Sequence, residues 1–299
     1  MLPILAELFR AGLSSVAIAL NTVLHATPLL LLALCKPLVW PALRRRITRV
    51  LNALAHGWIA VNSWLIEHLV GTRIHVQGGE GLQRNGWYLV VCNHQSWVDI
   101  PVLQQVFNTR IPLLKFFLKR QLIWVPVLGL AWWALDFPFM RRYSRAQLEK
   151  HPEWRGKDLE ATQRACEKFR DLPVSIMNFV EGTRFTAAKH AQQNSPYRHL
   201  LLPRAGGTAF VLQAMGSMLQ ALVDVSVVYP AGRPTLYGLL AGRVREVRVH
   251  IRTSPIPAEL LTGDYQNDAA FRARFQDWLN GIWQEKDARM QELQQDPAT

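Results

Sequence analysis

Residues 89–99 have the sequence Leu-Val-Val-Cys-Asn-His-Gln-Ser-Trp-Val-Asp, and the interpretation of the whole chain depends on them. An apolar run ends abruptly at Asn93 and His94, which predicts a buried strand that carries polar side chains to the carboxyl edge of a sheet. Ligands bind at that edge in open α/β sheets. A histidine oriented by a carboxylate can remove a proton from a hydroxyl, so His94 and Asp99 are candidates for a general base and its partner.

The spacing of His94 and Asp99 restricts how they can cooperate. On one continuous helix, five positions would separate the two side chains by about 140°. We therefore expect His94 in a loop and Asp99 in the first turn of the following helix, where Pro101 is well tolerated. The alternative is that Asp99 or Ser96 only caps that helix and that His94 is an ordinary loop residue. The spacing alone leaves both interpretations open.

Apolar, strand-like runs alternate with helical patterns beyond residue 72. The predicted strands cover residues 73–76, 87–92, 174–180, 222–229 and 247–251, and the predicted helices cover residues 97–108, 157–170, 207–219 and 267–293. Strands separated by helices predict an α/β domain. We expect three regions, which are a membrane anchor with an amphipathic helix over residues 1–70, an α/β domain over residues 71–254, and a linker with a C-terminal helix over residues 255–299.

The N-terminal region has the character of a membrane segment. Residues 11–35 carry no formal charge and are long enough as a helix to cross a bilayer. A cleaved signal peptide is the alternative, but Lys36 follows the run in place of a small-residue cleavage site. Arginines at 44–46 predict that the bulk of the protein faces the cytoplasm. Residues 51–70 predict an amphipathic helix that pairs with the first helix, lies in the interface or covers the core.

A second apolar segment, residues 122–140, contains two prolines, a glycine and an aspartate. These residues disfavour a regular spanning helix. We expect a buried or interfacial element here rather than a second membrane span.

Charge and composition narrow the class of partner. The chain has 34 Lys and Arg against 22 Asp and Glu, a net charge of +12, which suits an anionic membrane, a phosphorylated substrate or nucleic acid. Eleven tryptophans and 49% apolar residues favour the membrane, and the aromatics are not interleaved with basic residues as in a nucleic-acid stacking surface. Three widely spaced cysteines argue against a disulfide framework and against a zinc site.

Three further motifs place charged residues or glycines at the ends of apolar segments. They are Phe139-Met140-Arg141, Glu181-Gly182-Thr183-Arg184 and Pro203-Arg204-Ala205-Gly206. Each alone is compatible with an ordinary strand end and solvated charges. In this order, after Asn93-His94-x-x-x-x-Asp99, they resemble the motifs of the glycerolipid acyltransferases, which include the lysophosphatidic acid acyltransferase family. The resemblance covers about residues 87–230.

This resemblance implies a fold and a site. The fold would be α/β, a central mixed sheet flanked by helices, with an N-terminal pair of membrane-associated helices. His94 would be the general base and Asp99 would orient it. Substrate binding would fall on residues of the other three motifs. Arg184 and Arg141 would bind the phosphate of the acceptor, and Glu181 and Gly182 would shape that loop together with Thr183. Pro203 and Gly206 would belong to the acceptor loop or to the acyl-donor site. Neither a cofactor nor a metal is implied, because the acyl donor, acyl-CoA or acyl carrier protein, arrives as an activated thioester.

The implied reaction is acyl transfer to the free hydroxyl of 1-acyl-glycerol-3-phosphate, which gives phosphatidic acid. The expected location is a bacterial inner membrane, with the catalytic domain facing the cytoplasm. Two alternatives remain: an acyltransferase for another lysophospholipid, such as lysophosphatidylglycerol or lysocardiolipin, and a membrane-tethered protein with a degenerate domain that binds nucleic acid or protein. Nucleic acid is the less expected partner, and oligomeric state is left open.

Overall fold

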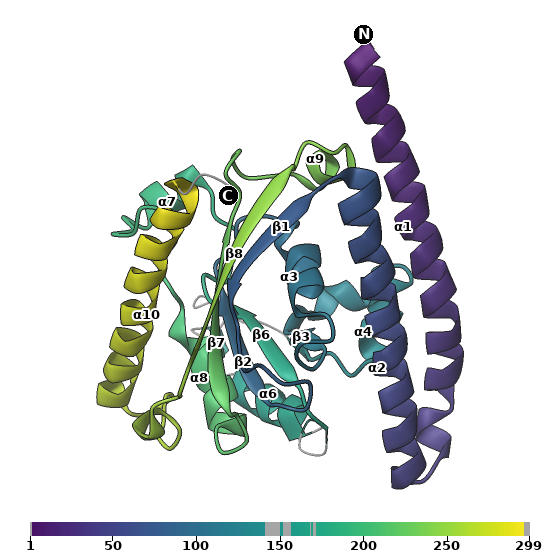
Figure 1. Cartoon of the computed structure of the whole chain (residues 1–299). Helices are drawn as coiled ribbons and strands as arrows, with labels where there is room; N and C mark the ends of the chain where they lie inside the picture. Colours follow the sequence, from purple (N-terminus) through teal and green to yellow (C-terminus); the bar gives the residue numbers. More distant parts are fainter. Residues whose placement is uncertain (1, 141–149, 152–156, 168, 170–171, 296–299) are drawn as a thin grey trace.

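The computed structural model describes residues 2–140, 150–151, 157–167, 169 and 172–295, and it is built around a six-stranded sheet (Figure 1). The strands lie in the order β1-β8-β7-β2-β6-β3. They comprise β1 (Arg73–Gly78), β2 (Tyr88–Cys92), β3 (Leu114–Phe116), β6 (Ser175–Phe179), β7 (Ala221–Val228) and β8 (Glu246–Ser254). Two short strands, β4 (Leu118–Lys119) and β5 (Phe139–Met140), pair separately.

The sheet is mixed, as predicted. Strands β3, β6, β2 and β7 run parallel, β8 is antiparallel to β7, and β1 is parallel to β8. Cys92, the last residue of β2, is in register with Phe179 of β6 and Val225 of β7. The residues that follow β2 and β6 therefore emerge side by side at one carboxyl edge, where a ligand site is expected.

Helices cover both faces of the sheet. They comprise α1 (Leu2–Leu34), α2 (Pro41–Trp64), α3 (Asp99–Phe107), α4 (Leu128–Ala134), α6 (Lys157–Glu167), α7 (Ala187–Gln192), α8 (Ala205–Met215), α9 (Leu236–Leu240) and α10 (Ala269–Gln295). Figure 1 shows α1, α2 and α3 on one side of the sheet and α10 on the other. The predicted helices at 97–108, 157–170, 207–219 and 267–293 are confirmed within a few residues.

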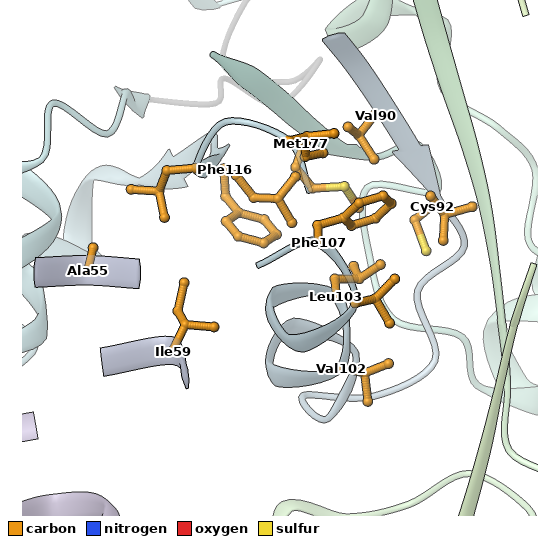
Figure 2. Close-up of a cluster of buried hydrophobic side chains, with 14 of the residues drawn as sticks. Ala55, Ile59, Val90, Cys92, Val102, Leu103, Phe107, Phe116 and Met177 are labelled. Atoms are coloured by element: carbon orange, nitrogen blue, oxygen red, sulfur yellow. The ribbon is translucent and has the colours of Figure 1, made fainter. Parts of the chain in front are cut away.

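Strand β2 is buried on both faces because its side chains alternate between two apolar cores. Val90 and Cys92 face the core shared with α1 to α4, whereas Leu89 and Val91 face the core shared with α6, α8 and α10. Figure 2 shows the first of these cores, where Val90 and Cys92 approach Phe107 of α3. A strand covered on both faces has a continuous apolar sequence, which is the pattern seen at residues 89–92.

The N-terminal helices pack as an antiparallel pair against the α/β domain. The Asn21 side-chain amide of α1 donates to the Trp58 carbonyl oxygen at 3.0 Å and to Asn62 Oδ1 at 2.8 Å. Helix α2 begins at Pro41, ten residues earlier than the predicted amphipathic helix, so the arginines at 44–46 lie in its first turns. A short π-helical stretch, Leu65–Val70, continues it.

Among the described residues, one helical stretch, Ile4–Leu38, is long and apolar enough to cross a membrane. The second apolar segment, residues 122–140, contains a 3-10 turn, the seven-residue helix α4 and strand β5. Seven helical residues extend about 10 Å, far less than the thickness of a bilayer. The expectation of a buried or interfacial element at 122–140, in place of a second membrane span, agrees with these short elements.

Candidate active site

His94 and Asp99 are hydrogen-bonded to each other at the carboxyl edge of β2. His94 lies in the loop after the strand, and Asp99 is the first residue of α3. His94 Nδ1 lies 2.8 Å from Asp99 Oδ2. The same oxygen accepts the backbone N–H groups of Gln95 at 2.7 Å and Ser96 at 2.9 Å. The predicted loop-and-first-turn arrangement is confirmed, and Asp99 contacts the histidine as well as the backbone groups before its helix.

A fourth hydrogen bond fixes the Asp99 carboxylate from the opposite side. The Tyr229 hydroxyl, just beyond β7, donates to Asp99 Oδ1 at 2.6 Å. Asp99 is fully buried, and within the described residues four hydrogen bonds to protein groups hold its carboxylate. Burial raises the pKa of Tyr229 well above its ordinary value, and Asp99 acts in the same direction. Tyr229 therefore stays protonated and remains a donor at neutral pH.

The His94 ring is held flat against Phe179 of β6, with ring centroids 3.9 Å apart and an angle of 15° between the ring planes. Its side chain is 14% exposed. Because Nδ1 faces a carboxylate, the neutral ring carries its proton on Nδ1 and presents a lone pair at Nε2. Within the described part of the chain, no hydrogen bond involves Nε2. The arrangement can accept a proton from a hydroxyl placed against Nε2.

Glu181, beyond β6, joins three loops rather than facing solvent. Its Oε1 accepts the backbone N–H of His94 at 3.0 Å, and its Oε2 accepts the N–H of Leu201 at 3.3 Å. Burial raises the pKa of Glu181 to about 8. The carboxyl group is therefore largely protonated at pH 7. Its two hydrogen bonds connect the loop that carries His94 (residues 93–98, the histidine loop) to the chain segment at Leu201.

Gly182 and Thr183 shape the turn that leads to Arg184. Gly182 has a φ of +69°, a backbone conformation that disfavours other residues, and an added Cβ would lie 3.3 Å from Arg204 Cδ. The Lys189 ammonium donates to Thr183 Oγ1 at 2.6 Å and to the Arg184 carbonyl oxygen at 3.0 Å, so it fastens the turn to α7. Gly182 thus contributes its backbone conformation to this turn, and Thr183 contributes a side-chain hydrogen bond.

Arg184 extends this turn toward solvent. Its guanidinium carbon lies 4.6 Å from the centre of the Trp97 ring, and Trp97 is 51% exposed on the histidine loop. The next residue, Phe185, donates its backbone N–H to the His94 carbonyl oxygen at 2.7 Å. The structure therefore brings Arg184 to the loop that carries His94.

The remaining sequence-predicted residues are less closely joined to His94. Arg141 lies outside the described residues. Pro203 is buried, and its carbonyl oxygen accepts the Gln276 side-chain amide of α10 at 3.1 Å. Gly206 lies in the first turn of α8, where an added Cβ would be 3.9 Å from the Tyr265 ring, an ordinary contact. The described contacts place Pro203 and Gly206 toward α10 and the segment before it.

Sequence reasoning missed two residues of this edge, Tyr229 and Arg233. Both follow β7, which is parallel to β2 and lies next to it. The rule that ligands bind at the carboxyl edge of parallel strands therefore applies to the loop after β7 as well. Asn93 belongs to the Asn-His motif after β2, but the sequence predicted no role for its side chain. Its side-chain amide pairs with both the N–H and the carbonyl of Val227, at 2.9 Å each, and so fastens the histidine loop to β7.

Cys92 lies directly before this loop but is unsuited to nucleophilic chemistry. The residue is fully buried in the apolar core. Burial raises the pKa of its thiol well above the ordinary value. A thiol that stays protonated at neutral pH is a poor nucleophile, so Cys92 fills the apolar core and is no candidate for covalent catalysis.

Comparison with known proteins identifies the relatives of this chain. A family model described as "Acyltransferase" matches residues 73–230, more than half of the chain. The 1-acyl-sn-glycerol-3-phosphate acyltransferase 2 of Brassica napus is 29% identical over 242 residues, which cover 75% of this chain and 59% of that protein. The human 1-acyl-sn-glycerol-3-phosphate acyltransferase delta is 28% identical over 218 residues, which cover 68% of this chain and 52% of that protein. The chain thus spans between half and two-thirds of the length of these relatives.

The fold also matches a solved structure. The crystal structure of the 1-acyl-sn-glycerophosphate (LPA) acyltransferase PlsC from Thermotoga maritima superimposes with a TM-score of 0.53. The match covers 97% of this chain and 100% of that chain at 14% sequence identity. The common architecture therefore includes the N-terminal helices as well as the sheet.

Proposed function

Because the chain belongs to the Acyltransferase family, we propose that it transfers an acyl group from a thioester donor to the free hydroxyl of a lysophospholipid. The proposed acceptor is 1-acyl-glycerol-3-phosphate and the product phosphatidic acid. One observation carries the proposal: the Nδ1 of His94 is held by the buried Asp99 carboxylate while Nε2 is left unpaired within the described residues. That geometry suits a general base for an alcohol.

The proposed reaction has two proton transfers. His94 Nε2 removes the hydroxyl proton of the acceptor as its oxygen attacks the carbonyl carbon of the thioester. The resulting imidazolium is stabilised by Asp99 at 2.8 Å, as a carboxylate does in hydrolase triads. The carbon–sulfur bond then breaks, and the departing thiolate receives the proton from His94. The products are a new ester and a free thiol, with no acyl-enzyme between them.

Arg184 is proposed to bind the phosphate of the acceptor. Its guanidinium is exposed and lies against Trp97, which belongs to the His94 loop. Arginine presents a planar fork of donors that matches phosphate oxygens. The net charge of +12 also favours anionic ligands, and the lysolipid, the membrane surface and the thioester donor are all anionic.

Helix α1 is proposed to associate with a membrane, with the α/β domain on the cytoplasmic side. Its outer face is mainly apolar, with exposed side chains at Ile4, Leu5, Leu8, Phe9, Leu13, Val16, Leu20, Val23, Leu24, Leu31 and Leu34. Its inner face contacts the rest of the protein over most of its length. Glu7 near its start is ion-paired with Arg243 at 2.7 Å, and Ala33 near its end is buried. A helix that crosses the bilayer would give up these contacts, so the packing favours α1 lying along the cytoplasmic leaflet.

The position of the N-terminus tests this arrangement. A protease-cleavable tag placed before residue 1 is expected to resist protease added outside intact spheroplasts and to be cleaved after lysis. A C-terminal tag is the control, because it is cytoplasmic in both arrangements. Digestion of the N-terminal tag from outside would show instead that α1 crosses the membrane, as the sequence alone predicts.

The proposed activity is tested with the purified protein and a panel of substrates. Acyl-CoA and acyl carrier protein thioesters are each paired with lysophosphatidic acid, lysophosphatidylglycerol and lysocardiolipin, and a mock purification serves as the blank. Phosphatidic acid is the expected main product. Transfer only to a phosphodiester acceptor would select the alternative lysophospholipid, and no transfer from any donor to any acceptor would reject the proposal.

A further inference from the structure

Two hydrogen bonds attach the loop after β7 to the segment from His94 to the start of α3. At its start, the Tyr229 hydroxyl bonds to Asp99. At its end, the Pro234 carbonyl oxygen accepts the Ser96 hydroxyl at 2.7 Å. Arg233 lies between these two attachments, directly before Pro234. Its backbone is therefore held beside the loop that carries His94.

The Arg233 guanidinium is stacked on an aromatic ring of the neighbouring turn. Its central carbon lies 3.7 Å from the centre of the Phe185 ring, and Phe185 is joined to His94 through its backbone N–H. Arg184, the residue before Phe185, stacks in the same manner on Trp97. Two guanidinium groups are thus held on the rings of Trp97, which follows His94 by three residues, and Phe185, whose backbone is hydrogen-bonded to His94.

Among the residues that the structure describes, neither guanidinium forms an ion pair with a carboxylate. In the described ranges, the ion pairs formed by arginines involve other residues, and Arg184 and Arg233 are absent from them. Burial lowers the pKa of Arg233 and Glu181 acts in the opposite direction, whereas burial raises the pKa of Glu181 itself to about 8. At pH 7 most of the Glu181 population is therefore uncharged, so the positive charge of Arg233 remains available to an anion.

We propose that Arg233 binds the acceptor phosphate together with Arg184 and selects a phosphate monoester over a phosphodiester. A phosphate monoester carries a charge of about −1.5 to −2 at pH 7. A phosphodiester headgroup carries a single negative charge and has one fewer free oxygen. Two guanidinium groups match the monoester in both charge and number of acceptor oxygens. This inference rests on the proposed acyl transfer and names the class of acceptor headgroup for that site.

The test compares two acceptors in the Arg233→Gln variant at saturating donor concentration. We expect kcat/KM for lysophosphatidic acid to fall about 10- to 100-fold, the loss of a hydrogen bond to a charged group. The value for lysophosphatidylglycerol is expected to fall much less. Arg233→Lys keeps the charge but not the fork of donors, so it should recover part of the loss. Equal losses on both acceptors, or no loss on lysophosphatidic acid, would overturn the proposal.

Two controls separate this outcome from misfolding and from failure of the acyl-transfer proposal. Arg274→Gln is the matched variant, because Arg274 also lies against a ring, Phe271 in α10, far along the chain from the site. It should leave both kcat/KM values unchanged. Independently of catalysis, lysophosphatidic acid in neutral detergent should raise the thermal midpoint of the wild-type protein more than that of Arg233→Gln. A wild-type protein that binds this lipid but transfers no acyl group would reject the reaction and keep the phosphate site, whereas equal shifts in both proteins would reject the site.

Discussion

Replacing His94 with alanine is expected to lower kcat about 10²- to 10⁴-fold, the usual contribution of a general base. The fold should survive, because the His94 side chain packs on Phe179 and is otherwise held by Asp99. Acyl transfer and the thermal unfolding midpoint are measured on the same preparation. A kcat within tenfold of wild type, from a protein with a normal unfolding midpoint, would show that His94 is not the general base.

The Asp99→Asn variant tests the contribution of the Asp99 negative charge separately from its hydrogen bonds. Asp99 Oδ2 accepts two backbone N–H groups besides His94 Nδ1, so an asparagine must keep its oxygen there and turn its NH₂ group toward the Tyr229 hydroxyl. The His94 tautomer is then preserved, and what is lost is the negative charge that stabilises the imidazolium. We expect kcat to fall less than in His94→Ala, by about 10- to 100-fold. Asp99→Ala removes both orientation and charge and should approach the His94→Ala value.

The position of this site could be predicted because it depends on local sequence. A continuous apolar strand ending in Asn93-His94, and a proline two residues after Asp99, define a strand, a loop and a helix start within thirteen residues. The mixed sheet was not a consequence of these patterns and came from the resemblance. The start of α2 was missed because its first turns contain three arginines, whose polarity hides the periodicity that begins only at Leu51.

Long-range partners could not be predicted in the same way. Tyr229 stands 130 positions from Asp99, and although the edge rule places it near β2, nothing in the sequence of β7, which includes the polar residues Asp224 and Ser226, pairs the Tyr229 hydroxyl with Asp99. Glu181 was assigned to the acceptor loop, but its burial and its bonds to two backbone N–H groups depend on where the chain segment at Leu201 passes. These contacts arise from tertiary packing, and neither propensity nor spacing encodes them.

Lys286 shows the same limitation and leads to the largest expected effect on stability. A lysine in a helix with many charged residues would be taken as solvent-exposed, yet its side chain is completely buried between α10 and the sheet. Its ammonium lies 2.5 Å from Asp224 Oδ1 and donates to the Val225 carbonyl oxygen at 2.5 Å. Asp224, on the central strand β7, is 6% exposed. This ion pair therefore attaches α10 to the strand that leads to Tyr229.

Lys286→Met is expected to lower the free energy of unfolding by about 3–5 kcal/mol, because it leaves Asp224 as a buried charge without its main partner. Arg252, whose guanidinium is 4.0 Å from Asp224 Oδ2, offsets part of this loss and places the result toward the lower end. The double variant Lys286→Met/Asp224→Leu should regain most of the stability, since it removes the stranded charge as well. Denaturant unfolding of the two single variants and the double variant measures the coupling, and a double variant no more stable than Lys286→Met would refute it.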